Sequence, residues 1–232
     1  MNEKTAARTA GLALILMTLA ASFSYGYVHG SLVVPGEAQA TLQRLTASSM
    51  LFRAEIFGWL LILILDIVVA WAFYLFLKPI HHGLSLLAAW LRLSYASILG
   101  IAIMCLIMVS LLTNGSSAAA SLFAAGRQLP GLAMLFLKAF ESVWSVGLIV
   151  FGGHLLLVGC LALRSPAIPR IIGILLLAAG AGYVAVHLGR AFAPEYAALV
   201  TMLEYGFMLP MIAGELGFAL WLLFKPSLNS AK

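Results

Sequence analysis

The sequence predicts an all-α fold, a polytopic membrane bundle of six transmembrane helices. Hydrophobic residues make up 63% of the 232 residues and charged residues only 9%, against about 45–50% and about 25% in ordinary soluble domains. So few charges cannot cover the surface of a soluble protein. The apolar residues also fall in blocks of about 20 or more, the length at which a helix crosses a hydrocarbon core of about 30 Å.

The first predicted span covers residues 8 to 28. The opening MNEKTAARTAGLALILMTLAAS has the basic start and apolar stretch of a secretory signal, but it lacks a convincing small-x-small cleavage site. We therefore expect an uncleaved transmembrane helix. Residues 29 to 50 form the longest piece outside the spans, and AQATLQRLTASS within it can form a short helix lying on the membrane surface.

Five further apolar blocks complete the predicted bundle. The third and fourth spans exceed the length that a bilayer requires, so we expect them to tilt or to project beyond the lipid. SPAIPR forms a tight inner turn, in which Pro169 suits the first turn of the fifth helix. The five spans run at about 51 to 77, 84 to 112, 131 to 163, 169 to 192 and 199 to 224.

The basic residues beyond the spans or close to their ends predict the orientation. With a cytoplasmic N-terminus, seven of them lie inside and three outside, so the positive-inside rule places both termini in the cytoplasm. We expect a single domain, residues 1 to 232, in a bacterial cytoplasmic (inner) membrane with lipid as its partner. The inner residues are Lys4, Arg8, Lys78, Arg164, Arg170, Lys225 and Lys232, and the outer ones are Arg44, Arg127 and Arg190.

Composition and spacing also exclude several kinds of partner. The net charge of +5 does not predict nucleic-acid binding, because the basic residues are scattered and form no patch. Cys105 and Cys160 both lie inside spans and build neither a disulfide framework nor a thiolate cluster. No two histidines have the spacing that puts metal ligands on one helix face, so no metal is predicted. The sequence leaves cofactors and oligomeric state open.

Several acidic, basic and histidine residues lie deep within the predicted spans or one to two turns from their outer ends. An ionised group at mid-bilayer costs about 2.5–3.5 kcal/mol and is expected to face the bundle interior. The second span reaches Asp66 from outside after about 15 residues, and the third reaches Arg92 from inside after about nine, so the two arrive at similar depth. We therefore predict that they form an ion pair. His154 and Glu215 complete a predicted inner polar layer of Asp66, Arg92, His154 and Glu215.

A second polar layer is predicted nearer the outside. Lys138 and Glu141 are three residues apart and can pair along one helix face. Arg53 and Glu204 can instead extend to the membrane interface, where tryptophans such as Trp59 are also candidate anchors. This outer layer comprises Arg53, Glu55, Lys138, Glu141, His187 and Glu204.

Two further spacings concern the helix faces. Glu55 and Asp66 are 11 residues apart, as are Glu204 and Glu215, so each pair lies on one face about 16 Å apart, the geometry of a polar column. Pro210 can kink the sixth helix between its two acids.

Small residues predict close helix contact at Gly180, Gly182, Ala185, Gly189, Gly214 and Gly217.

Three stretches carry a resemblance to a known family: SLVVPGEAQATLQRLTASSMLFRAEIFGWLLILILDIVVAWAFYLFLKP, FGGHLLLVGCLALRSPAIPRIIGILLLAAGAGYV and LPMIAGELGFALWLLFK. They closely resemble the bacterial membrane proteins grouped as domain of unknown function 4386 (DUF4386). The resemblance covers nearly the whole chain and implies six helices, but it implies no activity, because none is assigned to that family. The residues that match the family pattern are Arg53, Asp66, Arg92, His154 and Glu215.

Three classes of function remain open from the sequence. Our best hypothesis is binding or transport of a small or amphipathic solute, with Glu215 or His154 exchanging a proton, although the absence of repeated halves counts against a transporter. The first alternative is a structural or regulatory subunit whose buried ion pairs only fix helix packing. The second is an intramembrane enzyme acting on a lipid or isoprenoid, with His154 as candidate catalytic general base.

Overall fold

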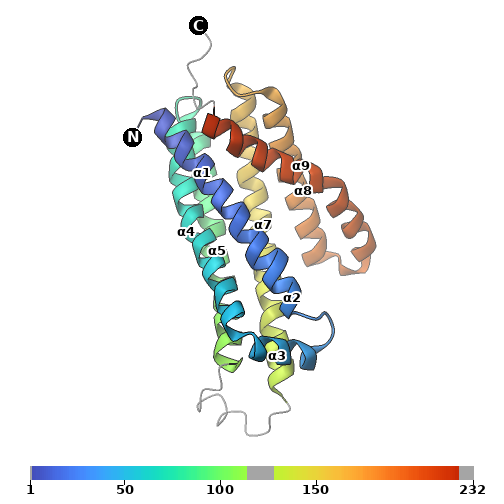
Figure 1. Ribbon diagram of the computed structural model, residues 1–232. Helices are drawn as coiled ribbons and strands as arrows, with labels where there is room; N and C mark the ends of the chain where they lie inside the picture. Colours follow the sequence, from blue (N-terminus) through green and yellow to red (C-terminus); the bar gives the residue numbers. More distant parts are fainter. Residues whose placement is uncertain (1, 114–127, 225–232) are drawn as a thin grey trace. The chain divides into compact units, whose positions relative to one another are not determined.

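The computed structural model describes residues 2–113 and 128–224, and every regular element in these ranges is helical. Six of its helices are long and apolar enough to cross a membrane (Figure 1). The all-α class and the six membrane helices are therefore confirmed. The segment TNGSSAAAS, residues 113 to 121, in which a glycine and serines predict an outer turn, lies almost wholly outside the described residues. The same holds for Arg127, Lys225 and Lys232, on which the predicted orientation partly rests.

The first membrane helix is longer than predicted and changes its type along the way. Helix α1 (Glu3–Ala21) continues through a π-helix, η1 (Ser22–His29), into α2 (Gly30–Leu32). At the end of η1, the N–H of Gly30 is directed at the carbonyl of Tyr25, five residues earlier. Such wide π-helical turns are rare and often occur at functional sites. Because the helix does not end at residue 28, His29 lies within it.

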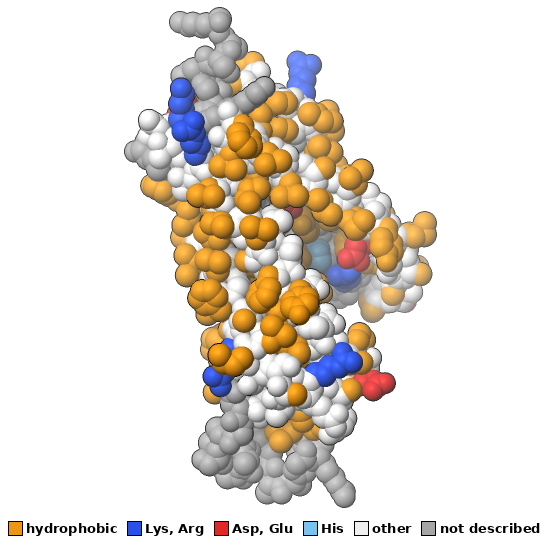
Figure 2. Space-filling model, viewed as in Figure 1, with side chains coloured by type: hydrophobic (Ala, Val, Ile, Leu, Met, Phe, Trp, Pro, Cys, Tyr) orange, Lys and Arg blue, Asp and Glu red, His pale blue; other side chains and the backbone are white. Residues whose placement is uncertain are grey.

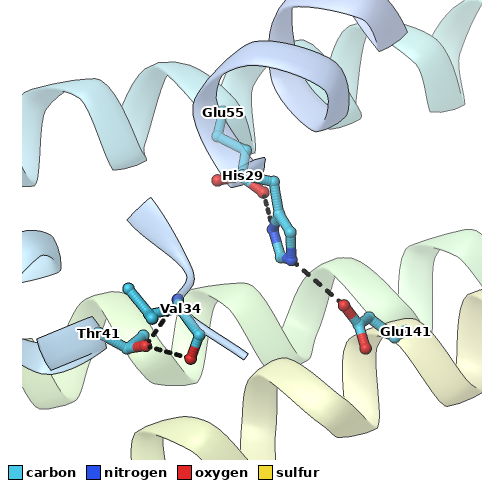
Figure 3. A network of polar contacts seen from close by, with 5 residues as sticks. All are labelled: His29, Val34, Thr41, Glu55 and Glu141. Atoms are coloured by element: carbon cyan, nitrogen blue, oxygen red, sulfur yellow. Dashed lines mark hydrogen bonds and ion pairs between the residues drawn. The ribbon is translucent and has the colours of Figure 1, made fainter. Parts of the chain in front are cut away.

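The short helix expected outside the spans is present as α3 (Ala38–Ala47). It is tied to the end of the first helix by Thr41, whose hydroxyl accepts a hydrogen bond from Val34 N–H at 2.9 Å and donates one to the Val34 carbonyl at 3.3 Å (Figure 3). Arg44 Nη1 also donates to the Ser31 carbonyl at 2.9 Å. Gly36, with φ of 80°, makes the turn that precedes α3. The position of α3 on a membrane surface stays a prediction.

The remaining helices match the sequence prediction, since each predicted end lies within two residues of the observed one. Pro169 directly precedes the fifth membrane helix of the chain and fixes where that helix starts. A single 3₁₀ turn, η2 (Pro194–Tyr196), connects the last two. The helices are α4 (Ser49–Leu77), α5 (His82–Thr113), α7 (Leu129–Arg164), α8 (Arg170–Phe192) and α9 (Ala197–Phe224).

The chain divides into two compact units, each of which draws on several of the long helices. Unit 1 comprises Met1–Leu16, Ile64–Ile98 and Ser145–Lys232, and therefore contains α8 and α9 in full. Unit 2 comprises Met17–Leu63 and Leu99–Trp144, and contains η1, α2 and α3. The two polar clusters described below each belong to one unit.

In unit 1, α7 and α8 approach each other along a seam of glycines. A Cβ atom at Gly180 would lie 2.7 Å from the carbonyl oxygen of Gly152, and one at Gly159 would lie 3.0 Å from the carbonyl oxygen of Gly173. The glycines repeat every seven residues on both helices, which is the spacing of a coiled-coil seam. Without side chains, the two backbones come into direct contact.

Helices α8 and α9 form an antiparallel hairpin in the same unit (Figure 1). A Cβ atom at Gly182 would lie 2.6 Å from the side chain of Phe207, and one at Gly214 would lie 3.1 Å from the backbone of Leu175. Gly217 differs, because a Cβ atom there would meet nothing within 4 Å. The close helix contact predicted at Gly217 is therefore wrong, whereas those at Gly182 and Gly214 are present.

Large apolar side chains remain exposed on the membrane helices. Figure 2 shows one face of the molecule, on which hydrophobic side chains predominate and charged ones are few. A soluble protein with this surface would be prone to associate through it, whereas lipid tails are a suitable environment for it. Examples of such side chains are Ile64, Trp71, Ile101, Met104, Ile171 and Ile174.

Candidate functional site

The centre of unit 1 contains the predicted ion pair between α4 and α5. Arg92 Nη2 lies 2.7 Å from Asp66 Oδ1, and the two side chains are 1% and 0% exposed. The ion pair between Asp66 and Arg92, predicted from their similar depth along the two spans, is therefore present. An ion pair buried this completely must compensate the loss of hydration of both charges, which requires close contact and further polar partners.

His154 supplies one such partner to the guanidinium group. Arg92 Nη1 donates a hydrogen bond to His154 Nε2 at 3.1 Å, and His154 Nδ1 donates to the backbone carbonyl of Ala88 at 2.8 Å. We assign this tautomer from the network, because a guanidinium can only donate and a carbonyl can only accept. His154 is therefore neutral in this arrangement, with its single lone pair already occupied by Arg92.

Two aromatic rings pack against both Arg92 and His154. The Cζ atom of Arg92 lies 5.9 Å from the ring centre of Phe73 and 5.3 Å from that of Phe151. The imidazole of His154 stacks against the same two rings, with centroid distances of 5.9 Å and 5.8 Å. The ring faces attract the cation and also keep its surroundings apolar. The sequence analysis missed both residues, because a phenylalanine in an apolar span has no distinguishing signal.

Glu215, the fourth residue of the predicted inner layer, lies on α9 in the same unit. Its Oε1 accepts a hydrogen bond from the hydroxyl of Tyr183 on α8 at 3.0 Å. Glu215 and Arg92 also line one void of about 10 Å³, close to the smallest volume that holds a water molecule. The remaining residues that line this void are apolar: Leu14, Phe73, Leu155, Val158, Leu176 and Phe218.

Two outer-layer residues of unit 1 have partners that the sequence analysis did not name. Glu204 forms an ion pair with Arg190, and both side chains are 45% exposed. Ser145 Oγ and His187 Nδ1 lie 2.8 Å apart, within hydrogen-bond distance. Both partners follow from helix register, because antiparallel helices around a short turn bring residues at equal distances from the turn face to face.

Neutralising Glu204 should have a small effect. Because the Arg190–Glu204 pair is half-exposed, we expect Glu204→Gln to lower the free energy of unfolding by less than about 1 kcal/mol, the usual contribution of an exposed pair. Unfolding by denaturant in mild detergent measures this. A loss several times larger would contradict this assignment and would place the pair in the hydrocarbon region.

In unit 2, a different histidine organises the outer-layer acids. His29 Nδ1 lies 2.7 Å from Glu55 Oε1, and its Nε2 lies 3.5 Å from Glu141 Oε1 (Figure 3). Sequence reasoning missed His29, because the predicted first span ended one residue before it. The π-helix η1 carries His29 into the interior, where it is 5% exposed.

Three further predictions for unit 2 need correction. Among the residues that the structure describes, Lys138 and Glu141 form no ion pair, because Glu141 faces His29 instead. The side chain of Lys138 is exposed and does not face the interior, whereas the exposed side chain of Arg53 agrees with the alternative that it extends away from the interior. Trp59 is only 1% exposed, so it packs in the core and is not an interface anchor.

The described part of the chain also bears on metal binding. Between residues 2–113 and 128–224, no group of three His, Cys, Asp or Glu side chains is placed to hold a metal ion. His29, Glu55 and Glu141 are therefore not arranged as a metal site.

Six long apolar helices, with charged side chains buried within each unit, define this molecule as a multi-pass membrane protein. The comparison with protein families gives the more specific assignment. The chain belongs to the family described as domain of unknown function (DUF4386), whose model matches residues 9–225. The family membership predicted from the sequence is confirmed.

An uncharacterized protein of Archaeoglobus fulgidus is 33% identical over 171 residues, which are 74% of this chain and 83% of the relative. No solved structure matches the chain. These comparisons establish the family and leave its function to be inferred from the site.

Proposed function

We propose that this protein binds or transports a small or amphipathic solute in a bacterial cytoplasmic membrane, with both termini inside, and that the void beside Arg92 and Glu215 is the solute site. The observation that carries this proposal is the composition of the wall. One acidic and one basic side chain line the same void, and every other lining residue is apolar. An amphipathic solute needs both kinds of surface.

The charge balance of the cluster favours a cationic solute. Asp66 and Arg92 cancel each other, and the hydrogen bonds of His154 keep it neutral. Glu215 then adds one negative charge when it is ionised, which is unfavourable in a low-dielectric site unless a proton or another cation compensates it. We therefore infer an exchange at Glu215 between a proton and the cationic group of the solute.

The site must open before it takes up a solute. The void has room for about one water molecule, so the side chains around it have to move. Pro210 lies inside α9, between Glu204 and Glu215. Because a proline removes one backbone hydrogen bond of its helix and commonly produces a bend, α9 is the element in which we expect this movement.

The geometry supports solute binding better than an enzyme with His154 as general base. A general base needs a lone pair within reach of the substrate proton. The lone pair of His154 Nε2 already accepts from Arg92, and Nδ1 donates to the Ala88 carbonyl. His154 therefore fits the role of a residue that orients Arg92.

The proposal can be tested by identifying what the purified protein carries. We expect native mass spectrometry and solvent extraction of protein in mild detergent to reveal a stoichiometric amphipathic solute. The Glu215→Gln variant should retain at most about one tenth of the solute that the unaltered protein carries, because a charge-assisted contact contributes about 1.5–3 kcal/mol. The control is Glu195→Gln, which makes the same change at an exposed residue of the turn before α9.

The control variant should retain the solute as the unaltered protein does. If the unaltered protein carries only loosely held bulk lipid, the solute proposal is wrong. The buried charges of unit 1 would then serve helix packing alone.

A further inference from the structure

The cluster around His29 in unit 2 joins an accessible carboxyl group to a buried one. The side chain of Glu141 is 48% exposed, that of His29 is 6% exposed and that of Glu55 is fully buried. Three separate helices, η1, α4 and α7, contribute these residues. In Figure 3 the imidazole lies between the two carboxyl groups, with one ring nitrogen directed at each.

Aromatic side chains hold this imidazole in place. Tyr25 stacks on the ring of His29 at a centroid distance of 5.2 Å and an angle of 22°. Phe140 lies 5.8 Å from the same ring, and Trp59 and Trp144 pack against Phe140. The ring is thereby fixed in an orientation that presents both nitrogens to acids. Among the described residues, the titratable groups recorded against His29 are Glu55 from α4, Glu141 from α7 and Tyr25 from η1 itself.

The buried end of this cluster is not fully satisfied by the protein. Glu55 Oε2 is buried and has no hydrogen-bond partner among the described residues, and the same holds for Nε1 of Trp59, one helical turn further along α4. A carboxylate in such a place is costly, and protonation removes the charge. A residue that only fixed helix packing would be expected to use both of its oxygens.

We propose that Glu141, His29 and Glu55 form a proton relay, in which the imidazole passes a proton between the half-exposed and the buried carboxyl group. The relay starts with a protonated Glu141, a neutral His29 with its proton on Nδ1 and an ionised Glu55. The O–H bond of Glu141 breaks as an N–H bond forms at Nε2. The N–H bond at Nδ1 breaks as an O–H bond forms at Glu55 Oε1. The net charge of the three groups is −1 before and after.

The distances agree with this sequence of steps. The 2.7 Å between His29 Nδ1 and Glu55 Oε1 is a hydrogen-bond distance. The 3.5 Å between His29 Nε2 and Glu141 Oε1 is too long for transfer, which takes place at about 2.6–3.2 Å. Because the Glu141 side chain is half-exposed, it has room to move, and its approach to Nε2 is the step that opens the relay. The relay does not depend on the solute proposed for unit 1.

The experiment follows the protonation of Glu55 after a pH jump, by time-resolved infrared spectroscopy on the full chain in lipid vesicles. The band of the protonated carboxyl group is assigned with isotope-labelled glutamate and by its shift in Glu55→Asp. We expect the band to appear when the pH falls and to disappear when it rises. In Glu141→Gln and in His29→Phe it should respond roughly 100-fold more slowly, as expected when acid–base transfer is lost.

Both variants are expected to fold like the unaltered protein, so a slower response would report on the relay. Glu141→Gln alters a half-exposed residue and leaves the His29–Glu55 contact in place, and His29→Phe preserves the stacking on Tyr25. The matched control is Glu37→Gln, an exposed acid of unit 2 that should leave the rate unchanged. The relay is disproved if the Glu55 band does not respond to pH, or if it responds equally fast in the unaltered protein and in both variants.

Discussion

Asp66→Asn is expected to lower the free energy of unfolding by about 3–5 kcal/mol, the usual consequence of removing one partner of a buried ion pair. Arg92 would keep its full charge while only 1% of its side chain is exposed. His154 cannot compensate that charge, because it is held as a neutral hydrogen-bond acceptor. Denaturant unfolding in mild detergent measures the loss.

A double exchange serves as the control for this prediction. Asp66→Arg combined with Arg92→Asp restores one charge of each sign and should recover part of the lost stability. Recovery is incomplete because the carboxylate would now lie where Arg92 donates to His154. A loss below about 1 kcal/mol for Asp66→Asn, which is typical of an exposed pair, would refute the buried ion pair as a stabilising contact.

Gly180→Ala is expected to destabilise the protein by about 1–3 kcal/mol, the usual cost of overpacking a core. The added methyl group would lie 2.7 Å from the carbonyl oxygen of Gly152 and 2.9 Å from the backbone nitrogen of Leu156. Backbone atoms cannot rotate away as a side chain can, so α7 and α8 would have to separate. Thermal unfolding in detergent, followed by circular dichroism, detects the change.

The same substitution at Gly206 provides the matched control. A Cβ atom at Gly206 on α9 would meet nothing within 4 Å, and alanine is favoured over glycine within a helix by up to about 1 kcal/mol. Gly206→Ala should therefore leave stability unchanged or raise it. Equal losses at Gly180 and Gly206 would mean that the glycine seam is not a close contact.

The membrane helices could be predicted from the sequence because their signal is strong and local. An apolar block of sufficient length, ended by residues such as Pro169, defines a span without knowledge of its neighbours. The Asp66–Arg92 pair could also be predicted, because depth along a straight helix follows from residue number alone. Both inferences need only the regular rise of an α-helix.

The rest of the site depends on rotation about the helix axes and on packing, neither of which the sequence shows directly. Lys138 and Glu141 had a suitable spacing, but Glu141 faces His29. The Arg190–Glu204 contact required the register of the α8–α9 hairpin. Phe73 and Phe151 enclose Arg92 and are indistinguishable by sequence from the aromatic residues of any apolar span.

The π-helix η1 also affects how the lengths of related sequences should be interpreted. Each residue added to or removed from a helix rotates everything after it by about 100°. Deleting one residue between Ser22 and His29 would permit an ordinary α-helix there, because the wider π-helical turns take up about one extra residue, and His29 would still face Glu55. When relatives are aligned, a one-residue gap in this stretch therefore marks the loss of the π-helix and leaves the histidine facing Glu55.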